Sequence, residues 1–125
     1  MNEKTQELRD RTKAYALRVI RLFRSVPRSI EAQVMGKQLL RSGTSVAANY
    51  RAACRARSRA EFLSKLCIVL EEADESILWI ELLVESGTLK KDKVEQLLDE
   101  SRQLTAIFTA ATSTMRQPNK FEIRN

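Results

Sequence analysis

The chain has 125 residues and a net charge of +6, and 43% of its residues are hydrophobic and 30% charged. A chain of this length forms one domain, residues 1–125, with a single ordinary core. Its three glycines and two prolines supply too few turns for an all-β protein, and the absence of histidine removes the usual general base and the commonest metal ligand.

The charge is distributed unevenly along the chain. Residues 1–60 carry 14 Lys/Arg and 4 Asp/Glu, whereas residues 61–125 carry 8 and 12. A basic half beside an acidic half indicates an anionic partner, or attraction between the halves or between subunits. Charged faces that are merely solvated are the alternative.

The first predicted helix spans residues 4–26. Its apolar residues recur at spacings of three and four, from Leu8 to Val26. A second side of the same helix gathers basic residues, namely Arg11, Arg18, Arg21 and Arg28. Pro27 ends the helix because it lacks an N–H and disfavours a helical conformation at the residue before it.

The second predicted helix spans residues 30–57, with Ser29 as its N-cap. Its weak point is the sequence Ser-Gly-Thr-Ser at residues 42–45, because these residues have low helix propensity. A break into two short helices is therefore an alternative. We favour one helix, since the apolar spacing resumes in phase and no proline follows. The run of small residues from Ser42 to Ala48 indicates close packing against a neighbouring helix.

The third predicted helix spans residues 59–86, and the fourth spans residues 91–115. Ser58 and Glu61 form a capping-box pattern at the start of the third helix, and Gly87 is a natural residue to follow its end. Residues 121–125 are expected to form a loose tail. Four long amphipathic helices with short connections predict an all-α fold, an antiparallel up-down-up-down four-helix bundle.

The third helix has more apolar surface than one core stripe requires. Leu78, Trp79 and Leu82 lie among the acidic residues that include Glu71 and Glu75. A strip of this kind indicates a subunit interface, and a widened monomer core is the alternative. The acidic run is also a candidate metal site, but carboxylate sites in helical bundles pair Glu with His, so we expect no metal and no other cofactor.

Basic residues form the remaining candidate site. Arg51, Arg55, Arg57 and Arg59 lie within nine positions, and Arg18 and Arg21 add to them from the first helix. The planar guanidinium group suits phosphate, so this arrangement predicts contact with RNA or another nucleic acid. Pairing of these arginines with glutamates, within or between subunits and without nucleic acid, is the competing hypothesis.

The sequence carries no pattern typical of an enzyme. Neither Cys54 nor Cys67 has an imidazole to activate it, and no glycine-rich phosphate loop is present. The first residues carry charges without a following apolar segment, and no apolar run is long enough to span a membrane. We therefore expect a non-enzymatic cytoplasmic protein with reduced cysteines.

Residues 45–76, SVAANYRAACRARSRAEFLSKLCIVLEEADES, resemble a bacterial four-helix-bundle family named for open reading frames in intervening sequences of large-subunit rRNA. The most specific part is SVAAN at residues 45–49 followed by RAEF at residues 59–62. Many members have Ala-Glu-Gly after the asparagine, whereas this chain has Tyr-Arg-Ala-Ala.

The resemblance implies a homopentameric ring and suggests RNA binding. The family is also similar in architecture to the accessory variability determinant of diversity-generating retroelements. That similarity implies nucleic acid, and a reverse transcriptase or another neighbouring gene product, as partners.

Overall fold

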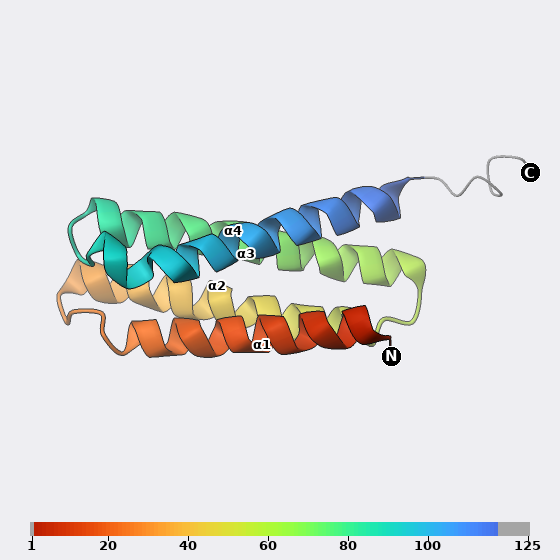
Figure 1. The fold of residues 1–125 in the computed structure, drawn as a ribbon, viewed down its shortest axis with the longest axis horizontal. Coiled ribbons are helices and arrows are strands. Elements are labelled where there is room, and N and C mark those ends of the chain that lie inside the picture. The colour runs from red at the N-terminus through yellow and green to blue at the C-terminus, as the bar shows by residue number, and fades with distance from the viewer. Residues whose placement is uncertain (1, 118–125) are drawn as a thin grey trace, which may run out of the picture.

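The computed structural model describes residues 2–117, which form the helices α1 (Glu3–Phe23), α2 (Ile30–Cys54), α3 (Arg59–Glu85) and α4 (Lys91–Arg116). The helices lie side by side, with the connections at 24–29 and 86–90 at one end of the bundle and the connection at 55–58 at the other (Figure 1). The most extensive packing joins α2 to α3, and α1 touches α4 least. The predicted all-α class is confirmed, since residues 2–117 contain no strand. The expected tail at residues 121–125 lies outside the described residues.

The first helix ends earlier than predicted. It stops at Phe23 rather than at residue 26, and the chain continues in a tight turn in which the Ser25 and Val26 N–H groups donate to the Leu22 and Phe23 carbonyls at 2.9 and 3.0 Å. Pro27 excludes a helical conformation at Val26, and the tight turn that leads to it already begins at Arg24. Val26 nevertheless stays in the core with 7% of its surface exposed. The prediction extended the helix to Val26 because a buried apolar residue in a turn can continue the apolar spacing of the helix before it.

The second helix runs without a break through residues 42–45. The Thr44 hydroxyl donates to the Leu40 carbonyl of the preceding turn at 2.7 Å, which keeps it within the helix. Gly43 lies directly against Val19 of α1, as the small residues predicted: a Cβ at Gly43 would lie 2.7 Å from the nearest Val19 methyl carbon. The helix ends at Cys54 rather than at residue 57, because the chain turns there to reach the N-cap of α3.

The caps of α2 and α3 differ. Ser29 occupies the N-cap position of α2, but its side chain makes no capping hydrogen bond. Ser58 caps α3 as predicted, since its Oγ accepts from the Glu61 N–H at 3.0 Å. The Glu61 carboxylate in turn accepts from the Arg57 N–H at 3.1 Å, one residue earlier than a standard capping box. At the other end of α3, Gly87 has the positive φ of 78° that favours glycine.

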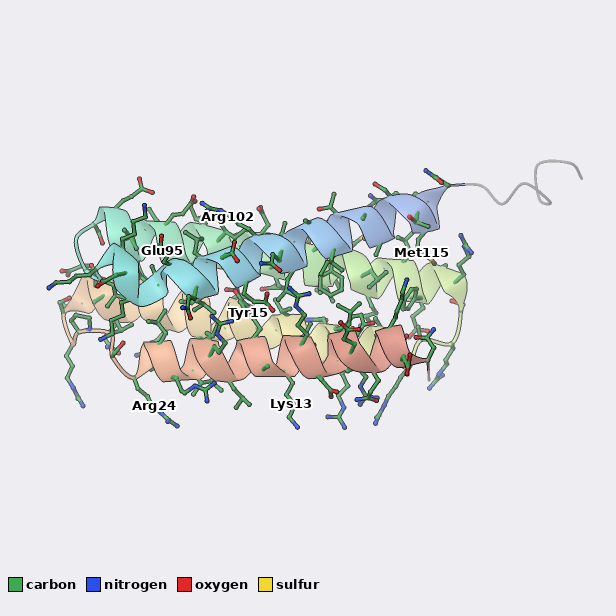
Figure 2. All side chains as sticks on the ribbon, viewed as in Figure 1. Lys13, Tyr15, Arg24, Glu95, Arg102 and Met115 are labelled. Atoms are coloured by element: carbon green, nitrogen blue, oxygen red, sulfur yellow. The ribbon has the colours of Figure 1, made fainter. Side chains whose placement is uncertain are left out.

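A layer of four buried hydroxyl groups crosses the middle of the core, with one from each helix. The Tyr15 hydroxyl lies 2.6 Å from Ser101 Oγ, and Ser42 Oγ lies 2.8 Å from Ser76 Oγ. Tyr15 is 1% exposed and the three serines are fully buried. Figure 2 shows Tyr15 on the inner side of α1. Burial raises the pKa of Tyr15, and hydrogen bonds from Ser101 and Ser76 oppose this shift. These hydroxyls satisfy one another, so the layer avoids the cost of unpaired polar groups in an apolar core.

Candidate nucleic-acid interface

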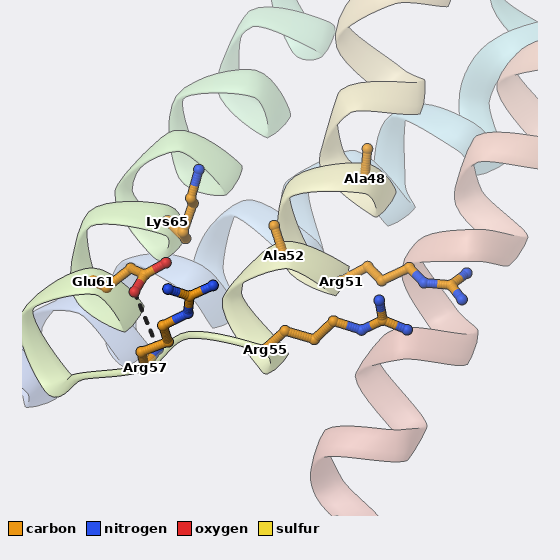
Figure 3. Close-up of a pocket in the computed structure, with 7 residues that line it drawn as sticks. All are labelled: Ala48, Arg51, Ala52, Arg55, Arg57, Glu61 and Lys65. Atoms are coloured by element: carbon orange, nitrogen blue, oxygen red, sulfur yellow. Dashed lines mark hydrogen bonds between the residues drawn. The ribbon is translucent and has the colours of Figure 1, made fainter.

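The end of α2 and the connection to α3 bring three of the predicted arginines together. Arg51 lies in the last turn of α2, Arg55 is the C-cap residue of that helix, and Arg57 follows in the connection. Together with Lys65 of α3 they surround a hollow of about 510 Å³ (Figure 3). The small side chains of Ala48 and Ala52 form its floor. The hollow exists because these alanines leave space between longer side chains on either side.

The charges around this hollow are not neutralised within the described chain. Among residues 2–117, the guanidinium groups of Arg51, Arg55 and Arg57 take part in no hydrogen bond or ion pair. Glu61 is the acidic residue at this hollow, and its carboxylate binds a backbone N–H instead. Clustered like charges repel one another, so the site favours an anion that neutralises them.

Arg59 does not join the other three arginines in this hollow. Its guanidinium group donates to the Met115 carbonyl at 3.3 Å, in the last turn of α4. A cation at a helix C-terminus is stabilising because it satisfies a free carbonyl and the negative end of the helix dipole. The predicted cluster of four is therefore three arginines at the hollow and one that contacts α4.

Arg18 and Arg21 lie apart from the α2 arginines. They line a separate hollow of about 340 Å³ between α1 and α4, together with Lys93. Lys93 lies in the first turn of α4, next to the 86–90 connection, which is at the opposite end of the bundle from the 55–58 connection (Figure 1). Arg11, from the same predicted basic side, forms a two-pronged ion pair with Glu100 at 2.7 and 2.8 Å. The basic side of α1 therefore contributes to packing on α4 as well as to an exposed surface.

A second hollow adjoins the first on the other side of α2. It has a volume of about 570 Å³, shares Ala48 and Arg51 with the first, and is also lined by Arg9 and Lys13 of α1. Sequence analysis missed Arg9, Lys13 and Lys65. These residues lie on the polar sides of their predicted helices. The periodicity of the sequence does not determine which neighbouring helix each polar side lies beside.

The predicted subunit-interface residues divide between exposed and paired positions. Leu78 and Leu82 are 47% and 38% exposed. The Trp79 indole N–H donates to the Glu75 carboxylate at 3.0 Å, and the Arg41 guanidinium pairs with the same carboxylate. Arg41 also pairs with Glu72 at 3.1 Å.

Glu75 therefore already has an arginine partner within the chain, which the sequence analysis did not identify. Glu71 is exposed. The helix α2 adds two exposed apolar side chains that were also missed, Ile30 at 84% and Val34 at 56%.

Other chemistry is sparse in the part of the chain that the structure describes. Residues 2–117 contain no group of three or more Cys, Asp or Glu side chains arranged to hold a metal ion. Cys54 and Cys67 are free thiols of intermediate exposure, and Cys67 Sγ accepts from the Arg116 guanidinium at 3.1 Å. No helix in this part of the chain is long and apolar enough to cross a membrane.

Comparison with known proteins identifies the family. The model of the family described as 23S rRNA-intervening sequence protein matches residues 4–110. The chain belongs to this family. A crystal structure of a protein with unknown function from the S23 ribosomal protein family of Bacteroides thetaiotaomicron is 34% identical to it, with a TM-score of 0.81. The similarity covers 88% of this chain and 98% of the Bacteroides chain. No curated protein matches.

This membership confirms the resemblance noted at residues 45–76. Arg51, Arg55 and Arg57 lie in that segment, which in this chain covers the end of α2 and the first two thirds of α3.

Proposed function

We propose that this chain is a non-enzymatic RNA-binding protein that contacts RNA phosphates through Arg51, Arg55 and Arg57. The observation that carries the proposal is the hollow at the end of α2, where three guanidinium groups have no partner within residues 2–117. The family's association with 23S rRNA points to RNA as the anion. Contacts of this type neutralise phosphates and release counterions, so the binding is largely independent of sequence and weakens steeply with salt.

The test is a binding titration of a structured 23S rRNA fragment across a salt series. The variant Arg51→Gln with Arg55→Gln removes two of the proposed phosphate contacts, and we expect a large loss of affinity at low salt. Arg102→Gln with Arg116→Gln removes the same charge from α4 and serves as the matched control. Absence of binding by the unmodified protein at low salt contradicts the proposal, and so does equal loss in both double variants.

We also propose that the chain is an antiparallel up-down-up-down bundle that assembles as a homopentameric ring. Exposed apolar residues on α2 and α3, namely Ile30, Val34, Leu78 and Leu82, support a subunit interface. A reverse transcriptase or another neighbouring gene product would then bind to the assembled ring. An assembly without RNA, in which the ring acts as a protein scaffold, is the second candidate function, and the same exposed apolar residues favour it.

Light scattering tests the assembly. Leu78→Asp with Leu82→Asp places two charges on the proposed interface, and we expect the mass to fall toward that of one chain. Ala106→Asp with Ala110→Asp adds the same charge to the exposed side of α4 and should leave the mass unchanged. A monomeric unmodified protein, or a mass unaffected by the leucine substitutions, contradicts this assignment. If the assembled protein binds no RNA, the scaffold function is the one that stands.

A further inference from the structure

The two hollows beside α2 form one continuous surface, which we call the furrow. The first hollow lies toward α3 and the second toward α1, and they meet at Ala48 and Arg51. Figure 3 shows the Arg51 and Arg55 side chains extending from α2 toward α1, with Lys65 on the opposite side of Ala52. The furrow therefore has cationic side chains from three helices around a floor of methyl groups.

The charge balance along the furrow is strongly positive. Six basic residues line it: Arg9, Lys13, Arg51, Arg55, Arg57 and Lys65. Two acidic residues also line it, and each is engaged in a local hydrogen bond: Asp10 accepts from Gln6 Nε2 at 3.0 Å, and Glu61 accepts from the Arg57 N–H at 3.1 Å. The positive potential of a concave surface of this kind attracts and holds a polyanion.

The shape of the furrow distinguishes between kinds of nucleic acid. Its two hollows, of about 510 and 570 Å³, each have the volume of a site for one small organic molecule. A flexible strand fits its sugars over the exposed Ala48 methyl and its phosphates against the cationic walls. A duplex is a rigid convex cylinder, so it would contact the rims and leave the alanine floor empty.

The furrow has no aromatic platform on which bases could stack. No aromatic side chain lines either hollow in the described part of the chain. Binding here would therefore rest on the phosphate backbone charge, which is largely independent of sequence, with the arginine planes left to contact bases.

On the basis of the proposed RNA-binding function, we propose that the ligand is single-stranded RNA, which lies with its phosphate backbone along the furrow across α2. Lys13 and Lys65 are then phosphate-binding residues, and Ala48 is the floor that admits the strand. Lys13 lines the second hollow and projects outward from α1 (Figure 2), where it neutralises a phosphate at one end of this path.

The experiment measures the binding of a fluorescent oligouridylate of about 12 nucleotides, within the usual site size for such proteins, and of an RNA duplex of equal length. Unmodified protein should bind the single strand more tightly at every salt concentration. Lys13→Gln with Lys65→Gln should reduce the slope of log K against log salt by about 1.4, or about 0.7 for each lost phosphate contact. Lys90→Gln with Lys91→Gln, at the opposite end of the bundle, is the matched control and should leave the slope unchanged.

The variant Ala48→Gln separates shape from charge. It keeps the net charge and a good helix former, but it fills the floor of the furrow, so it should weaken single-strand binding severalfold. Ala106→Gln, at an exposed position of α4, should have no effect. If neither single strand, duplex nor rRNA fragment binds, the proposed RNA-binding function fails. If RNA binds but prefers the duplex, or ignores the Lys13, Lys65 and Ala48 substitutions, RNA binding stands and the furrow assignment is overturned.

Discussion

Because Gly43 packs closely on Val19, we predict that replacing it with alanine destabilises the protein, although alanine has the higher helix propensity. Gly43→Ala in an isolated helix would be stabilising by about 1 kcal/mol. Here the new Cβ would lie 2.7 and 2.9 Å from the two Val19 methyl carbons and 3.1 Å from Val19 Cβ. Ordinary contacts between carbon atoms are about 3.5–4.0 Å, so α1 and α2 must move apart. Val19 is fully buried and, as a β-branched residue, has little freedom to rotate away.

Overpacking of this kind costs about 1–3 kcal/mol, which exceeds or matches the gain in propensity. We therefore expect Gly43→Ala to lower the free energy of unfolding by up to about 2 kcal/mol. At about 4 °C per kcal/mol for a domain of this size, that loss lowers the Tm measurably. Urea unfolding followed by circular dichroism, at a fixed protein concentration, measures the change.

A double-mutant cycle with Val19→Ala tests the cause. Removing the two methyl groups costs about 2 kcal/mol by itself, but it also removes the two closest contacts, so the penalty of Gly43→Ala should be at least about 1 kcal/mol smaller in the V19A background. Gly36→Ala is the matched control in the same helix, because its nearest contacts are 3.1 Å or longer. The reasoning is refuted if G43A is more stable than the unmodified protein, if V19A leaves its penalty unchanged, or if G36A costs more.

Three further predictions concern the caps and the tyrosines. Ser58→Ala should cost about 1 kcal/mol because it removes a capping hydrogen bond, whereas Ser29→Ala should cost only a few tenths since Ser29 makes none; equal losses in urea unfolding would contradict this. Tyr15→Phe should cost about 1 kcal/mol through the lost hydrogen bond to Ser101, and an unchanged unfolding midpoint would count against it. Burial raises the pKa of Tyr15 and raises that of Tyr50 to about 12. The folded state thus keeps protons that the unfolded chain releases above about pH 10, so the contribution of the two tyrosines to stability should be constant below pH 10 and fall between pH 10 and 12; no loss of stability between pH 10 and 12 would refute it.

The ends of α3 show what local sequence was able to predict. Ser58, Glu61 and Gly87 act within a few residues of themselves, through a cap, a backbone hydrogen bond and a positive φ, so their roles follow from their neighbours in the chain. Val26 was placed wrongly in the first helix. It is an apolar core residue at helical spacing from Leu22, but it lies in the turn after the helix.

The candidate site was predictable only in part, because its residues come from three helices. The sequence analysis grouped Arg51, Arg55 and Arg57 because they are close in the chain, and the structure places them at one hollow. It also grouped Arg59 with them, although that side chain bonds to α4. Which residues meet across helices depends on the rotation and axial offset of each helix, and amphipathic spacing determines neither. The pairing of Arg41 with Glu75, from α2 to α3, is a contact of this kind.

The layer of buried hydroxyls has a consequence for the furrow. If α1 slid along its axis by one helical turn, Tyr15 would move by about 5.4 Å and leave Ser101. Each buried hydroxyl left unpaired costs about 1–3 kcal/mol, so this displacement is strongly disfavoured. Lys13 lies two residues from Tyr15 on the same rigid helix. The hydrogen bond inside the core therefore fixes the axial position of α1 against α4, and with it the position of Lys13 along the bundle.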